Sequence, residues 1–149
     1  FRRVLFRSAN VGDSRLYYIG KDIQQITRDH SLVEDMVRMG LLEKEEARTH
    51  YKKNVITKAI GVAEDKTATP DIFEIEIDNG DKLLLCSDGL TNMVIDYDIN
   101  KIIRKSESIE DAVRTLINTA NENGGKDNIS AILISAEYTE NQDSLLSEQ

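Results

Sequence analysis

The chain has 149 residues, enough for one domain with a buried core, and its 40% apolar and 31% charged residues are typical of a globular protein. Its formal charge of -8 argues against nucleic acid or an anionic membrane surface as the main partner, because both attract positive charge. No apolar stretch is long enough to cross a bilayer, and the one cysteine, Cys86, excludes an intrachain disulfide, so we expect a reducing, cytoplasmic setting.

The first eight residues, FRRVLFRS, make a poor start for a domain because they include no initiator Met. The stretch RRVLFRS is similar to the translation of a sequencing adapter joined to a truncated gene, so residues 1–8 are predicted to be non-native sequence. The alternative interpretation is a half-buried strand with Val4 and Phe6 on one face.

A hairpin and a flap are predicted next. Residues 9–19 and 23–27 contain β-like runs, and the Gly-Lys-Asp turn between them predicts a hairpin loop of about three residues. Ser31 and the glutamate three residues later form a capping-box pattern, which predicts a helix that ends at Gly40. The highly charged segment 43–50 has no wide apolar stripe, so it is expected to be a short, exposed helical stretch in a loosely held flap.

The middle of the chain alternates strand and turn signals. Residues 54–61 are predicted to be a short strand or a turn. Apolar and acidic residues alternate over 72–77, which predicts a strand with one wet face. Asn79-Gly80 is typical of a tight hairpin turn, and the apolar run 82–87 suits a strand buried on both faces.

Two helices and a strand complete the predicted core. One helix is expected over about 96–105, and a second begins at Ser108, where Asp111 completes a cap pattern. Residues 129–135 are apolar on both faces, which predicts a central strand. The polar, acidic segment 137–149 is predicted to be a disordered tail.

Three aspartates lie at predicted strand ends: Asp13 before a strand, Asp88 after a buried strand and Asp127 before another. Carboxylates that converge on one point repel each other unless a cation or protons neutralise them, and a hard divalent cation prefers oxygen ligands. Gly12 and Gly89 beside two of them allow tight turns or close backbone approach. Taken singly, each aspartate is more often a turn former or a helix cap, so periodicity alone indicates an α/β or α+β domain of unknown function.

Five motifs follow one another along the chain: Asn10-Val-Gly-Asp-Ser-Arg15, Thr27-Arg-Asp-His-Ser31, Asn54-Val-Ile-Thr-Lys-Ala-Ile-Gly61, Leu85-Cys-Ser-Asp-Gly-Leu90 and Gly125-Lys-Asp-Asn-Ile129. Their order and spacing over residues 9–136 resemble the C-terminal portion of the bacterial metal-dependent (PPM-type) serine/threonine protein phosphatases. The resemblance implies an α+β fold, a four-layer αββα sandwich whose N-terminal part is missing here.

The resemblance also implies a site and a reaction. Asp88 and Asp127 would bind a binuclear Mn²⁺ or Mg²⁺ centre, and Asp13 with Asp88 would hold a third metal. Phosphoserine and phosphothreonine in proteins would be hydrolysed by a metal-activated water, without a covalent phosphoenzyme. The expected partners are phosphorylated proteins, among them a cognate serine/threonine kinase and its substrates, and the expected state is a monomer. Residues 31–53 would form the flap beside the active site.

This sequence departs from the family pattern by lacking two N-terminal motifs, the phosphate-binding Arg with its acidic neighbours and the Asp-Gly-x-Gly-Gly segment. The chain alone is therefore predicted to be inactive, with uncovered sheet edges. One alternative is a non-catalytic regulatory module of the same fold. Another is a Ca²⁺-binding structural domain, which is disfavoured because the sequence has no Asp-x-Asp-x-Asp-Gly loop.

Three further residues are given structural interpretations. Cys86 is predicted to be a buried core thiol, because a cysteine phosphatase needs an Arg six positions later and position 92 is Asn. His30 is predicted to pack or hydrogen-bond, and Arg15 to pair with a nearby carboxylate.

Overall fold

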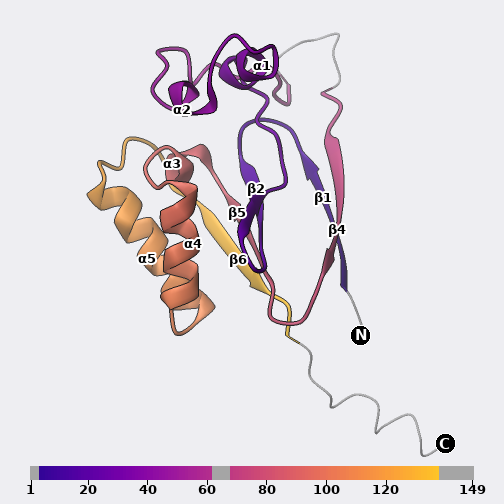
Figure 1. Ribbon diagram of the computed structural model, residues 1–149, viewed down its shortest axis with the longest axis vertical. Coiled ribbons are helices and arrows are strands. Elements are labelled where there is room, and N and C mark those ends of the chain that lie inside the picture. The colour runs from indigo at the N-terminus through magenta and orange to yellow at the C-terminus, as the bar shows by residue number, and fades with distance from the viewer. Residues whose placement is uncertain (1–3, 62–67, 138–149) are drawn as a thin grey trace, which may run out of the picture.

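The computed structural model describes residues 4–61 and 68–137, in which two antiparallel sheets pack against each other (Figure 1). In chain order the elements are β1 (Val4–Asn10), β2 (Arg15–Ile19), β3 (Ile23–Gln25), α1 (Leu32–Arg38), α2 (Lys44–Ala47), β4 (Asp71–Ile77), β5 (Lys82–Cys86), α3 (Asp88–Thr91), α4 (Asp96–Lys105), α5 (Ile109–Glu122) and β6 (Ala131–Ser135). The larger sheet has the order β3-β2-β5-β6, and β1 pairs with β4 in the smaller one. The α+β prediction is confirmed.

The larger sheet buries a different set of side chains on each face. One face carries Tyr17, Leu84 and Cys86, which pack with buried residues of α4 and α5 such as Ile99 and Leu116. The opposite face packs against the smaller sheet, through a cluster built on Leu16, Ile77 and Leu83. Figure 1 shows α4 and α5 beside the larger sheet and the flap helices α1 and α2 at one end. The described residues thus supply three of the four predicted layers, one of helices and two of sheets.

Strand β1 corresponds to the alternative interpretation of the N-terminal segment. It pairs along its whole length with β4, from Val4 opposite Ile77 to Asn10 opposite Asp71. Phe6 points into the core between the sheets, whereas Val4 is exposed. Whether residues 1–8 are native sequence stays a prediction, and residues 1–3 lie outside the described part.

The first predicted hairpin is confirmed, and the second is wrong. Strands β2 and β3 pair around the loop 20–22, as expected. A turn does follow β4, with Gly80 at φ 89°, but β4 and β5 lie in different sheets. The tight type I′ turn needs positive φ at both central residues, and among the described residues only glycines have positive φ, so Asn79 does not adopt it. The turn therefore carries the chain from one sheet to the other.

Strand β6 is not central within the described residues, because it lies at the edge of the larger sheet beside β5. Ile132 is 61% exposed there, while Leu133 is buried on the helix side. Apolar residues on both faces were therefore a poor guide to the position of this strand in the sheet.

The predicted helices form with their predicted caps. The Ser31 and Ser108 hydroxyls accept the N–H groups of Glu34 and Asp111 at the starts of α1 and α5. Gly40 follows α1 at φ 70°. Segment 54–61 forms turns, with one β-bridge between Ile56 and Ser31.

Two remaining sequence predictions concern the C-terminal tail and membrane-spanning segments. The predicted disordered tail lies outside the described residues from position 138 onward. Among the described residues, no helix is both long and apolar enough to cross a membrane.

Candidate active site

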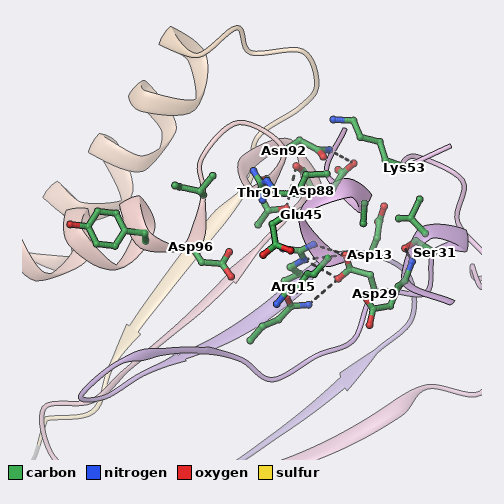
Figure 2. Close-up of a pocket in the computed structure, with 18 residues that line it drawn as sticks. Asp13, Arg15, Asp29, Ser31, Glu45, Lys53, Asp88, Thr91, Asn92 and Asp96 are labelled. Atoms are coloured by element: carbon green, nitrogen blue, oxygen red, sulfur yellow. Dashed lines mark hydrogen bonds and ion pairs between the residues drawn. The ribbon is translucent and has the colours of Figure 1, made fainter. Parts of the chain in front are cut away.

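A pocket of about 360 Å³ opens between the flap (residues 31–53) and the ends of the strands of the larger sheet (Figure 2). The flap contributes one wall, which includes Lys44, Glu45 and Lys53. The opposite wall comes from the turn before β2, from β2 and β3, and from α3 and the start of α4; it is strongly acidic, with Asp13, Asp29, Asp88 and Asp96.

Asp13 lies in the turn that joins β1 to β2. Gly12 has a φ of 113°, which a residue with a Cβ adopts at a cost, and its N–H donates to His30 Nδ1 at 3.0 Å. The His30 N–H donates back to the Gly12 carbonyl at 3.0 Å, so two hydrogen bonds fix the turn. Burial and then the negative charge of Asp88 raise the pKa of the Asp13 carboxyl. The prediction that His30 acts as a hydrogen-bonding residue is confirmed.

Asp88 is the first residue of α3, directly beyond β5. Its Oδ2 accepts a hydrogen bond from Asn92 Nδ2 at 3.2 Å, one helical turn later. Asp88 and Asp13 line the same pocket, although they are 75 positions apart in the sequence. The sequence did not identify Asn92 as a functional residue, and its position four residues after Asp88 was the available signal.

Asp127 lies on the exposed loop before β6 and is not among the residues that line this pocket. Its Oδ1 accepts the N–H of Asn128 at 2.7 Å. Ser87 fixes this loop, because its hydroxyl donates to the Asn128 carbonyl at 3.1 Å and accepts the Ser130 N–H at 3.0 Å. The segments that carry Asp88 and Asp127 are therefore joined directly.

Gly89 explains how closely these segments approach. A Cβ at this position would lie 2.2 Å from the Asn128 carbonyl oxygen, a distance that real Cβ atoms do not show. The sequence prediction that Gly89 permits close backbone approach is confirmed. Gly89 thus lets the first turn of α3 rest against the loop of Asp127.

A network of hydrogen bonds runs along the acidic wall of the pocket. The Arg15 guanidinium binds Asp29 through Nε at 2.9 Å and Nη2 at 2.7 Å, and it donates to Tyr17 Oη at 2.9 Å. Tyr17 in turn donates to Asp96 Oδ1 at 2.9 Å. Burial by itself would lower the pKa of Arg15, but the Asp29 hydrogen bond and the nearby charges raise it overall, so Arg15 stays charged. The predicted ion pair of Arg15 is confirmed. No sequence pattern pointed to Tyr17 or Asp96.

Cys86 lies at the end of β5 and is 5% exposed. Burial raises the pKa of its thiol to about 12, so the thiolate needed for nucleophilic attack is not available near neutral pH. The prediction of a buried core thiol is confirmed.

The structure brings two of the three predicted ligands together. Asp13 and Asp88 share the pocket, and the loop of Asp127 is packed against α3. Within residues 4–61 and 68–137, no group of three or more His, Cys, Asp or Glu side chains is arranged to hold a metal ion. The two pocket carboxylates fit a hard cation in donor chemistry, but they are only part of a ligand set.

Comparison with known proteins identifies the family. Residues 5–129 match the family described as Protein phosphatase 2C. The chain belongs to this family. The resemblance to PPM-type phosphatases, drawn from five short motifs, is confirmed.

Curated relatives of this family member are bacterial protein phosphatases, and some of them are named as serine/threonine phosphatases. The serine/threonine phosphatase stp of Listeria innocua is 42% identical over 127 residues, which cover 85% of this chain and 50% of that protein. Protein phosphatase PhpP of Streptococcus pneumoniae is 42% identical over 128 residues, covering 85% and 51%. The chain thus spans about half the length of the curated relatives it matches.

Solved structures that resemble this chain are also serine/threonine phosphatases. The serine/threonine phosphatase Stp1 of Staphylococcus aureus superposes with a TM-score of 0.86 at 43% identity, covering 93% of this chain and 54% of that one. The catalytic domain of the phosphatase PstP, in complex with two manganese ions, gives a TM-score of 0.79 at 29% identity, covering 93% and 56%.

Proposed function

We propose that this chain supplies part of the active site of a metal-dependent phosphatase that hydrolyses phosphoserine and phosphothreonine in proteins. The observation that carries the proposal is the shared pocket of Asp13 and Asp88 in a member of the protein phosphatase 2C family. The named relatives are serine/threonine phosphatases, and the manganese complex of PstP supports a divalent metal.

In this proposal Asp88 and Asp127 hold a pair of Mn²⁺ or Mg²⁺ ions, and Asp13 joins Asp88 at a third ion. Carboxylate oxygens are the ligands that these ions prefer. When bound, the ions supply Lewis-acid activation of water and stabilise charge on the phosphoryl group. The remaining ligands come from sequence beyond the described residues, in keeping with the half-length coverage of the relatives.

The residues of this chain orient that site. Asn92 donates to Asp88 Oδ2 and so helps to orient this carboxylate. Two hydrogen bonds hold the turn of Asp13: the Gly12 N–H donates to the His30 ring at Nδ1, and the backbone N–H of His30 donates to the Gly12 carbonyl. Ser87 holds the loop of Asp127 against the strand end. Preorganised carboxylates bind a cation without the cost of ordering three separate loops.

The substrates in this proposal are phosphorylated proteins, including a cognate serine/threonine kinase and the targets of that kinase. The protein acts as a cytoplasmic monomer. Dephosphorylation of a phosphothreonine peptide taken from such a kinase, measured by phosphate release, would support this substrate class. An extended, metal-loaded protein that hydrolyses small aryl phosphates but no phosphopeptide would contradict it.

The decisive experiment measures p-nitrophenyl phosphate hydrolysis with Mn²⁺ for this chain and for a version extended by upstream gene sequence. We expect activity only in the extended protein, and we expect Asp88→Asn to lower its kcat/KM on the order of 100-fold or more. Asp111→Asn, which alters an exposed carboxylate on α5, is the matched control and should leave the rate unchanged. If the extended protein folds and binds Mn²⁺ but hydrolyses nothing, the non-catalytic regulatory module replaces the enzyme.

A further inference from the structure

Helix α2 has little to hold it in place. It is a single turn, Lys44–Ala47, and none of its residues is buried. Its capping box joins Glu43 to Glu46, so these hydrogen bonds order the turn itself and not its position. A helix without a buried face is expected to open readily unless another contact fixes it.

Arg48, directly after α2, makes that contact. Its Nη2 donates to the Thr91 carbonyl oxygen at 3.1 Å, across 43 positions of sequence. Within 4–61 and 68–137, segment 43–53 has one other hydrogen bond to a residue outside the flap, the local bond from the Val55 N–H to the Lys52 carbonyl, so Arg48 makes the long-range one. The acceptor lies at the C-terminal end of α3, where a helix leaves carbonyls without partners inside the helix, and a charged donor strengthens such a bond.

The contact between Arg48 and Thr91 lies at the pocket that Asp88 lines. Thr91 ends the short helix that Asp88 begins. On the flap side, Lys44, Glu45 and Lys53 flank Arg48 in sequence and line the pocket. Figure 2 shows Glu45 and Lys53 in the same pocket as Asp13 and Asp88. The Arg48 contact therefore joins the segment that forms the flap wall to the helix that carries Asp88.

We propose that Arg48 is a positioning residue, a latch that fixes the flap against α3 and so holds the substrate-facing wall of the pocket in place. Its consequence for catalysis rests on the proposed phosphatase function, whereas its consequence for the flap does not. A substrate large enough to contact Lys44 or Lys53 then meets an ordered wall. Without the latch, the binding of such a substrate has to order α2 first, which weakens binding.

Hydrogen exchange in the 149-residue chain tests the latch without any need for activity. Arg48→Met removes the donor and keeps an unbranched side chain, and we expect the amides of 43–50 to exchange at least about threefold faster. Arg38→Met is the matched control, because this exposed arginine of α1 lies 3.9 Å from Asp35 on the same helix. Unchanged exchange over 43–50 in Arg48→Met would overturn the proposal. Faster exchange throughout β2 and β5 as well would also overturn it, because Arg48 would then support the whole fold.

Kinetics of the extended, metal-loaded protein give a second readout. We expect Arg48→Met to raise KM for a phosphothreonine peptide about 3- to 10-fold while kcat and the KM for p-nitrophenyl phosphate stay unchanged. Arg48→Lys should restore part of the peptide KM, since it keeps a charged donor. An equal change of KM for both substrates would show that the flap wall does not discriminate them. If no variant of the extended protein has activity while exchange responds as expected, the proposed function fails and the latch stands.

Discussion

Arg15 illustrates how one side chain can organise the wall of a site without being a ligand. Its side chain is 21% exposed and that of Asp29 is 13% exposed, so the pair is largely withdrawn from water. Two guanidinium nitrogens bind the carboxylate, and a third reaches Tyr17. A planar guanidinium can make all of these contacts at once, which a lysine cannot.

Arg15→Met is expected to destabilise the fold by about 3 kcal/mol, because it leaves Asp29 as a half-buried charge without its partner. The free energy of unfolding in urea at neutral pH measures this loss. Arg7→Met is the matched control, since Arg7 and Glu74 form a pair whose side chains are 70% and 55% exposed. The control should cost less than about 0.5 kcal/mol. Equal losses for the two variants would contradict the difference in burial.

At the residue scale, the sequence predicted what depends on local chemistry. Gly12, Gly89 and His30 were assigned from their motifs, and each has the predicted kind of role. The chain from Arg15 through Tyr17 to Asp96 was not foreseen, because it joins residues up to 81 positions apart and no local pattern encodes that contact. Metal binding by Asp13, Asp88 and Asp127 stays a prediction.

At the element scale, strand β4 is tied to the turn of Asp13 by a hydrogen bond of His30. Because Nδ1 of His30 accepts from the Gly12 N–H, the proton of the ring lies on Nε2, which donates to Asp71, the first residue of β4, at 3.0 Å. Lys58 Nζ lies 3.5 Å from the other carboxylate oxygen of Asp71. The His30 hydrogen bond is the largest cause that lowers the pKa of Asp71 below its ordinary value of 3.8; burial opposes it, and the charge of Lys58 adds to it. The ring of His30 thus links β4 to the backbone of Gly12.

Because the pKa of Asp71 is lowered in the folded protein, the stability that its ionised carboxylate adds depends on pH. The ionised Asp71 stabilises the fold fully above its unfolded pKa of 3.8, and that stabilisation is lost as pH falls through the lower folded pKa. We therefore expect Asp71→Asn to lower the urea midpoint at pH 5 to 6, with the difference from the unchanged chain shrinking as pH falls below 3.8. Asp22→Asn in the exposed loop after β2 serves as control. A difference that grows toward acid pH would contradict this assignment.

The positions of helices and strands in the sequence were easier to predict than which strands lie side by side in the sheets. Alternation identified β4, and cap patterns identified the starts of α1 and α5, because both signals act within a few residues. The turn after β4 was mistaken for a hairpin because Asn-Gly indicates a turn and not the sheet to which the next strand belongs. The edge position of β6 was missed because apolar residues on both faces do not show how many strands lie beside it.

At the scale of the whole molecule, each of the two sheets carries an exposed apolar side chain on one of its strands. Ile132 on β6 and Ile72 on β4 are 61% and 64% exposed. An edge strand with exposed apolar side chains is a template for pairing with another chain. The α+β class and the family could be predicted from ordered motifs, whereas this exposure depends on how strands pair and only the structure gives it.

Ile132→Lys is expected to weaken self-association of this chain on the order of tenfold, because a lysine on an edge strand opposes pairing with a second edge. Size-exclusion chromatography with light scattering over a range of concentrations measures the effect. Asn118→Lys adds the same charge on the exposed side of α5 and should have little effect. If both variants reduce association equally, net charge and not the edge of β6 is responsible.

The lone thiol at the end of β5 can be used to measure how often this strand opens. Cys86 is enclosed by the core between the larger sheet and the helices, and the chain has no second cysteine to confuse a labelling experiment. A maleimide or disulfide reagent can reach it only when the central strand separates from that core. The labelling rate of the unaltered protein then measures how often β5 opens, next to the residue on which the proposed catalysis depends.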